Sequence, residues 1–279
     1  MNDDLSTHPS APDVGRSDEG TASWRALLYE RFANQPTPVV LFSDSVRSAA
    51  SLWTGTRAWT STFRAVGVAR GDRVVSALPA GDALLQLTFA CLWESVGLVL
   101  ASTGVNGQLT AVDVDLLLER HDARCLVGAM VPDRPVLEPA AGGWPVSVSD
   151  GFRARATTGQ ARNTAAGFEE DIGAEPMPYA ECLAAAHHRR AHGAFARARV
   201  LTLCDWQRRA GLWGGVILPL LEVEELFVPR DRTNAAAVHR LLVEEPITHA
   251  LVEAGTSAKV RSVLLEQGVP VVVLPDTDP

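Results

Sequence analysis

Hydrophobic residues along this chain alternate between helical and extended spacing. Between residues 57 and 101, apolar positions first recur every three or four residues and then form a short continuous run from Val74 to Leu78, ended by Pro79. Gly67 and Gly71 bracket a turn before that run, and a second apolar helix is expected to end near Gly97. A helix, a tight turn, a buried strand and a second helix are typical of a parallel sheet layered with helices.

The same alternation continues over most of the remaining sequence. Helical spacing predicts helices over 24–32, 111–120, 181–190, 211–221, 235–244 and 257–267. Short apolar runs predict strands over 39–42, 123–130, 199–204, 226–229, 247–252 and 269–274. The pattern therefore predicts an α/β fold with a largely parallel sheet layered with helices.

Two segments depart from this pattern. Residues 1–22 are rich in Asp, Ser, Pro and Gly and contain few apolar residues, so we expect a disordered tail. Residues 132–178 accumulate Pro, Gly, Ala and Arg while the periodicity fades, which predicts an irregular connection or two short edge strands. The expected folded unit is therefore 23–279, with this connection inside it.

Composition limits the function classes. The 279 residues are 47% hydrophobic and 21% charged, which suits a globular protein with a substantial core. A formal charge of −8 argues against nucleic acid and anionic membranes as partners. No apolar run reaches about 20 residues, and the N-terminus lacks the charged start and apolar centre of a secretory signal. The expected location is the cytoplasm.

Cysteine and lysine usage narrow the possible chemistry. Cys91, Cys125, Cys182 and Cys204 lie far apart without metal-ligand spacing, which favours buried reduced thiols. Lys259 is the single lysine, so the other 24 of the 25 basic residues are arginine. A mechanism that requires a lysine has one candidate in this sequence.

The apolar unit at 57–101 resembles the N-terminal region of adenylate-forming enzymes, the superfamily of acyl-CoA synthetases, fatty acyl-AMP ligases and peptide-synthetase adenylation domains. The matching positions are Gly67-Val68, Gly71-Asp72-Arg73-Val74 and Leu78-Pro79. Two later segments, 198–229 and 239–260, are also similar, with matches at Leu201, Gly211, Leu212, Gly215, Pro219, Leu220, Thr248 and His249. The resemblance implies that 23–279 is a truncated AMP-binding-enzyme-like domain with the fold of the N-terminal portion of the large domain.

The family resemblance implies ATP or AMP with magnesium as the nucleotide cofactor. Family members hold the ATP phosphates with a loop rich in Ser, Thr and Gly that ends in a lysine. The candidate here comprises Thr157, Thr158, Gly159 and Arg162, and it lacks the preceding Ser-Gly, the proline and the lysine. Arginine can bind phosphate, so this is a degenerate phosphate loop, with a polar surface loop as the favoured alternative.

The resemblance also implies a substrate pocket at Trp206, Arg208 and Gly211. Arg208 stands where the family has a histidine that borders the acyl pocket, and an exposed arginine at a helix start is the favoured alternative. His188 and His192 have metal-chelating spacing, but no third ligand lies nearby, so a basic helix face is favoured and no metal site is predicted.

No catalytic residue is assigned, because the family's magnesium segment, ribose-binding aspartate and lid lysine have no counterpart in this sequence. One hypothesis is a truncated, degenerate ligase-like protein without stand-alone adenylation, which binds an acyl or nucleotide ligand or complements a second ligase half. If active, it would adenylate a carboxylate together with that partner subunit. The alternative is a non-catalytic interaction module, a pseudoenzyme that docks a biosynthetic partner protein. A gene remnant is the third possibility.

Overall fold

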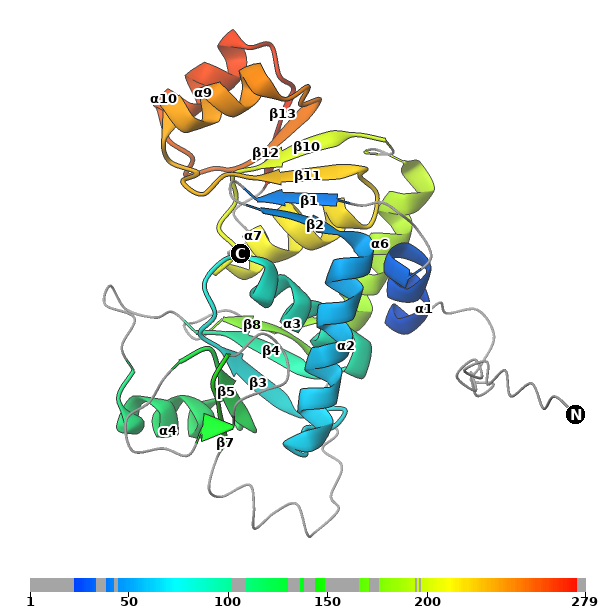
Figure 1. Ribbon diagram of the computed structural model, residues 1–279, viewed down its shortest axis with the longest axis vertical. Helices are drawn as coiled ribbons and strands as arrows, with labels where there is room; N and C mark the ends of the chain where they lie inside the picture. Colours follow the sequence, from blue (N-terminus) through cyan, green and yellow to red (C-terminus); the bar gives the residue numbers. More distant parts are fainter. Residues whose placement is uncertain are drawn as a thin grey trace, which may run out of the picture.

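The computed structural model describes residues 23–33, 39–42, 45–101, 109–129, 136–137, 144–148, 166–170, 176–193, 195 and 197–274. These residues form two mostly parallel sheets with helices between and outside them (Figure 1). The α/β prediction is confirmed, with the parallel strands divided between the two sheets.

The upper sheet in Figure 1 joins the beginning of the chain to its second half. Its strand order is β13-β12-β10-β11-β1-β2, and β2 alone is antiparallel to its neighbour among these described strands. The strands are β1 (Val39–Phe42), β2 (Ser45–Ser48), β10 (Arg199–Thr202), β11 (Glu225–Val228), β12 (His249–Glu253) and β13 (Val271–Leu274). Strand β1 therefore lies between β2, which follows it directly in the sequence, and β11, which comes from the second half of the chain.

The lower sheet has the order β6-β7-β5-β3-β4-β8-β9. The central strands β5, β3, β4 and β8 are parallel, and antiparallel pairs form both edges. The strands are β3 (Arg73–Ser76), β4 (Gly97–Leu100), β5 (Cys125–Val127), β6 (Val136–Leu137), β7 (Val146–Val148), β8 (Gly167–Glu170) and β9 (Met177–Pro178). The described parts of 132–178 thus add short strands at both edges of this sheet.

Helices fill the space between the sheets and cover their outer faces (Figure 1). The helical elements before residue 130 are α1 (Trp24–Leu28), the π-helix η1 (Tyr29–Ala33), α2 (Ala49–Ala65), α3 (Asp82–Glu94) and α4 (Ala111–Arg120). The later ones are α6 (Tyr179–His192), α7 (Arg209–Leu212), the π-helix η2 (Trp213–Ile217), α8 (Leu218–Leu220), α9 (Ala235–Glu244) and α10 (Ala258–Glu266). Helix α4 covers the lower sheet, and α9 and α10 cover the upper one.

One hydrophobic core connects both sheets. Trp59 and Phe63 of α2 and Phe89 of α3 are each 1% exposed and belong to the same cluster as Val74 in the lower sheet and Val40 in the upper sheet. Two smaller clusters lie beneath α4 and beneath α9 and α10. Because a single cluster spans the two sheets, we treat them as one folding unit.

Polar contacts reinforce this connection. The indole Nε1 of Trp24 donates to the Tyr179 carbonyl at 2.9 Å, and the Tyr179 hydroxyl donates to the Val96 carbonyl at 2.8 Å. The buried Arg31 donates to the carbonyls of Leu220 and Val223. These bonds satisfy buried backbone acceptors and tie α1 and η1 to segments far along the chain.

Most expected helices and strands occur, with two informative differences. Helix α3 ends close to the expected position near Gly97, because Ser95 at φ 55° turns the chain out of it, but the segment 97–100 that follows is strand β4, which was not predicted. Strand β2 was not predicted, since its sequence SVRS has no apolar run. Local spacing therefore located the helices well and missed strands that depend on pairing with a neighbour.

Candidate functional site

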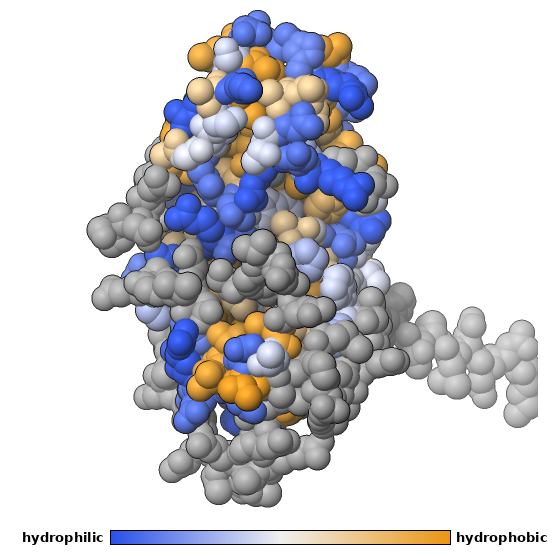
Figure 2. Space-filling view, turned by 90° about the vertical axis from the view of Figure 1, so that its left-hand side faces the viewer, coloured by the Kyte–Doolittle hydropathy of each residue, from blue (hydrophilic) through white to orange (hydrophobic). Residues whose placement is uncertain are grey.

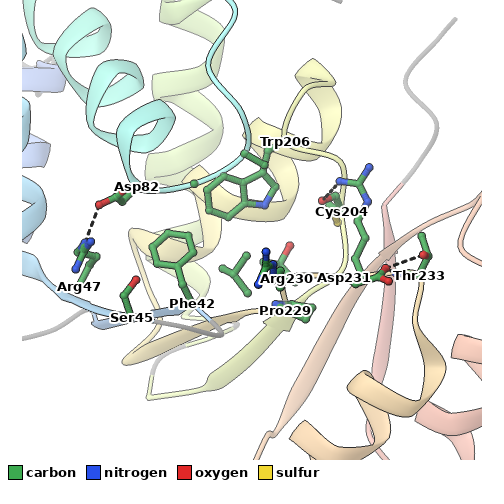
Figure 3. A pocket seen from close by; sticks show the side chains of 15 residues that line it. Phe42, Ser45, Arg47, Asp82, Cys204, Trp206, Pro229, Arg230, Asp231 and Thr233 are labelled. Atoms are coloured by element: carbon green, nitrogen blue, oxygen red, sulfur yellow. Dashed lines mark hydrogen bonds and ion pairs between the residues drawn. The ribbon is translucent and has the colours of Figure 1, made fainter. Parts of the chain in front are cut away.

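A cavity of about 540 Å³ opens where three parallel strands of the upper sheet end (Figure 3). Phe42 ends β1, Thr202 ends β10 and Val228 ends β11, and all three residues line it. Ala80 to Asp82 at the start of α3 form another wall. The carboxyl ends of parallel strands are where α/β proteins bind ligands, so this cavity is the candidate site.

An ion pair forms one side of the cavity. Arg47 Nε lies 2.7 Å from Asp82 Oδ2, and the two side chains are 35% and 37% exposed. Alternation along β2 places Ser45 and Arg47 on the same face, and both residues line the cavity. The pair joins β2 to the first turn of α3.

Two aromatic rings form the middle of the cavity. The Phe42 and Trp206 rings have centroids 5.9 Å apart and are tilted by 59°. Trp206 is 2% exposed, so protein atoms pack around its indole and fix the orientation of the ring. A ligand here would contact aromatic surface, the commonest apolar lining of small-molecule sites.

The loop from Arg230 to Thr233 forms the opposite side (Figure 3). Asp231 Oδ1 accepts hydrogen bonds from the Thr233 hydroxyl at 2.7 Å and the Thr233 N–H at 2.9 Å. These bonds hold the pKa of Asp231 below its ordinary value. Arg232 pairs with Asp205 at 2.8 Å and donates to the Cys204 carbonyl at 3.2 Å. The hydrogen bonds of Asp231 thus fix the backbone of the loop from which Arg230 and Arg232 line the cavity.

Thr202 and Cys204 provide buried polar groups at the end of β10. Burial raises the pKa of the Cys204 thiol to about 12, so this cysteine is neutral at physiological pH and is a poor nucleophile. Thr202 is 2% exposed, and its Oγ1 has no well-formed hydrogen bond to any described residue, although the thiol lies beside it. The hydroxyl is directed toward η2, where it lies 3.3 Å from the position that a Cβ on Gly215 would occupy.

The segment 204–208 is fixed from outside the cavity. Glu253 Oε1 accepts the Asp205 N–H at 2.8 Å. Gly211 packs so closely that a Cβ there would lie 2.1 Å from the Asp205 carbonyl oxygen. Only glycine fits at that approach, and the segment that carries Cys204 and Trp206 is thereby held in place.

The predicted site residues fall in different places. Thr157, Thr158, Gly159 and Arg162 lie outside the described residues. Trp206 lines the cavity, whereas Arg208 and Gly211 are not among the lining residues. Arg208 is exposed at the start of α7, and Gly211 acts through the packing just described. The structure therefore brings one of the three predicted pocket residues to the cavity.

Several lining residues were missed from the sequence, among them Phe42, Arg47, Asp82, Thr202 and Arg230. Phe42, Thr202 and Val228 each end a strand, and the pattern predicted those strands. Polar residues just after such strand ends are a usable signal for a site. The hydrophobic pattern does not predict which of these strands are neighbours in the sheet, so it could not bring their ends together.

The described residues contain no group of three or more potential metal ligands. Asp82 and Asp231 are the carboxylates of the cavity, and each is engaged by Arg47 or Thr233. Magnesium is usually held by one or two carboxylates together with water and substrate phosphates, so these two carboxylates by themselves form no preassembled magnesium site. Lys259 is exposed on α10 and is not a lining residue.

No helix within the described parts of the chain is long and apolar enough to cross a bilayer.

No family model and no curated protein matches this sequence. Solved structures do match its fold. A benzoate CoA ligase from Burkholderia xenovorans LB400 aligns with a TM-score of 0.59 at 14% identity, over 91% of this chain and 60% of that one. A Brucella canis acyl-CoA synthetase gives a TM-score of 0.65 at 14% identity, over 95% of this chain and 54% of that one.

The N-terminal domain of FACL13 from Mycobacterium tuberculosis also matches, with a TM-score of 0.60 at 14% identity, over 91% of this chain and 76% of that one. The chain thus spans little more than half the length of the first two matches. Identities this low establish architecture and not activity. The chain has the α/β fold of the N-terminal portion of acyl-CoA synthetases and related adenylate-forming enzymes.

Proposed function

We propose that this protein is a ligase-like binding protein that takes an acyl or nucleotide ligand in the cavity between β2 and the β11–α9 loop and does not adenylate a carboxylate by itself. The observation that carries the proposal is the cavity at the carboxyl ends of β1, β10 and β11. Its volume of about 540 Å³ is within the range of small-molecule sites, and its walls combine aromatic rings with arginines.

Adenylation makes demands that these residues do not meet. A carboxylate must attack the α-phosphate of ATP while negative charge builds on the phosphorus centre. The sequence has a single lysine, Lys259, which lies exposed on α10. Asp82 pairs with Arg47 and Asp231 accepts from Thr233, and the described residues hold no group of three potential metal ligands. Binding without stand-alone chemistry therefore agrees best with these residues.

A reducing compartment such as the cytoplasm suits this proposal. All four cysteines are free and buried, and burial raises the thiol pKa of Cys125, Cys182 and Cys204 to about 12. Buried neutral thiols are stable where no disulfide is required.

Ligand-induced thermal stabilisation tests the proposal. We expect at least one member of a panel of aliphatic and aromatic carboxylic acids, AMP and ATP with magnesium to raise the melting temperature of the full chain. The Arg230→Gln variant should reduce that shift, whereas Arg240→Gln on α9 should keep it, because Arg240 is not a lining residue. Pyrophosphate exchange with each acid should stay at background. An unmoved melting temperature across the panel would refute ligand binding, and clear exchange would refute the absence of stand-alone adenylation.

Strand β13 favours the second candidate, an interaction module that pairs with another ligase half or a biosynthetic partner protein. Val272 and Val273 are 37% and 50% exposed, and no described strand pairs with the outer side of β13. An apolar edge strand is a template for strand addition, and Pro270 and Pro275 confine that template to the four residues of β13. Strand β2 at the opposite edge also exposes a valine, Val46 at 60%, but carries the charged Arg47, a residue type that protects sheet edges.

A further inference from the structure

The polar groups of the cavity lie at two ends of an apolar middle. In Figure 3 the Arg47–Asp82 pair lies on one side of Phe42, and Arg230, Asp231 and Thr233 lie on the other. The sheet order explains this arrangement, because β1, which carries Phe42, separates β2 from β11. Strands are spaced by about 4.8 Å, so the two ends start from backbones roughly 10 Å apart.

Each end offers donors to an anion. A guanidinium has five N–H donors, and the described partners of Arg47 are Asp82 and, at 3.5 Å, the Val46 carbonyl. At the other end, Arg230 and Arg232 line the cavity, and Arg232 is paired with Asp205. The lining residues include three arginines and two aspartates, whereas the whole chain has a formal charge of −8. Because Asp205 pairs with Arg232, the charges at the cavity are close to balanced, in a chain that is acidic as a whole.

A ligand with one charged end would leave the other end of the cavity poorly matched. Its hydrocarbon tail would cover the Arg47–Asp82 pair or the arginines of the β11–α9 loop and remove their water. Removing water from charged groups without new hydrogen bonds is costly. A small ion, in turn, would make no contact with the apolar middle, which is formed by Phe42, Trp206 and Val228.

We propose that the cavity binds an elongated dicarboxylic acid, with one carboxylate at Arg47, its hydrocarbon body against Phe42 and Trp206, and the other carboxylate at Arg230. This inference rests on the proposed function and specifies its ligand class. Carboxylate–guanidinium pairs at both ends give specificity for the length of the acid as well as for its charge.

Binding to the full chain is measured by titration calorimetry with dicarboxylates of increasing length from succinate to sebacate. Each is matched with the monocarboxylate and the ω-amino acid of the same length. One dicarboxylate should bind roughly tenfold or more tighter than its monocarboxylate, since a second charge-assisted contact commonly contributes that much. The affinity should pass through a maximum with length.

In the Arg47→Gln variant, the affinity for that dicarboxylate should fall to the affinity for the monocarboxylate. The affinity for the monocarboxylate itself should stay within about twofold of its value for the native chain. Arg64→Gln is the matched control, because Arg64 is an exposed arginine that pairs with Glu94 at the other end of α3 and does not line the cavity. The comparison of ligands on the native chain stands even if Arg47→Gln fails to fold.

Equal affinities of mono- and dicarboxylates would overturn the inference while the proposed function survives. Tighter binding of the ω-amino acid would also overturn it and would assign a cation to Asp82. If no acid or nucleotide binds at all, the proposed function itself fails.

Discussion

At the scale of single residues, glycines allow the cavity wall to form. Gly215 of η2 lies against the segment that carries the buried polar groups, and a Cβ there would be 2.5 Å from Cys204 Cβ and 2.7 Å from its Sγ. Such contacts are shorter than atoms tolerate, so either the thiol or the helix would have to move. Gly215 was one of the positions that match the family resemblance, and its close packing gives that match a physical reason.

The Gly215→Ala variant should be destabilised by about 1 to 3 kcal/mol, because overpacking forces side chains and backbone from their preferred positions. Urea unfolding followed by fluorescence measures the change. Gly255→Ala is the matched control, since no atom lies within 4 Å of its Cβ position, and it should stay within about 0.5 kcal/mol of the native chain. Equal stability of the two variants would show that the wall is less tightly packed than described.

At the scale of elements, one helix N-cap joins the cavity loop to α9. Asn234 ends the loop that carries Arg230 and starts α9, and its Oδ1 accepts the N–H groups of Ala236 at 3.1 Å and Ala237 at 3.2 Å. The first-turn N–H groups of a helix have no partner within the helix, so the cap satisfies two of them. The same residue thus stabilises α9 and fixes the end of the loop.

The Asn234→Ala variant should lose about 1 kcal/mol of unfolding free energy, the usual effect of removing a helix N-cap. Asn234→Asp keeps an acceptor at the same position and should retain most of the stability. Chemical denaturation of the three proteins provides the comparison. A loss in the aspartate variant equal to that in the alanine variant would contradict the capping role.

At the scale of the whole molecule, the two sheets share one hydrophobic core. Tyr179 contributes its ring to that core and its hydroxyl to the Val96 carbonyl next to β4, while its own carbonyl accepts the Trp24 indole. Burial raises the pKa of the Tyr179 hydroxyl well above its ordinary value, so it remains a hydrogen-bond donor. Contacts of this kind predict a single cooperative unfolding transition.

The Tyr179→Phe variant should be destabilised by about 1 to 3 kcal/mol, because the Val96 carbonyl loses a buried donor. Tryptophan fluorescence and far-ultraviolet circular dichroism should shift to lower denaturant together. Tyr29→Phe is the control, because Tyr29 is the other tyrosine and is 47% exposed. Two separate transitions would show that the sheets unfold independently.

The amino-acid sequence alone determined the succession of the helices and of most central strands, because local spacing of apolar residues decides which segments can bury one face. It did not predict the strands β2 and β4. It also determined the turn at Gly67–Gly71, where φ values of 74° and 84° require glycine. The resemblance carried by those residues led to the same architecture as the solved structures.

Tertiary structure alone decided where the cavity lies. Phe42 and Arg47 come from the beginning of the chain and Arg230 from its last quarter, and they meet because β1 lies between β2 and β11. Local periodicity carries no information about which strands pair over such distances, since many pairings bury the same apolar residues. The neighbours of a strand are chosen by the packing of the whole core, and the site follows from that choice.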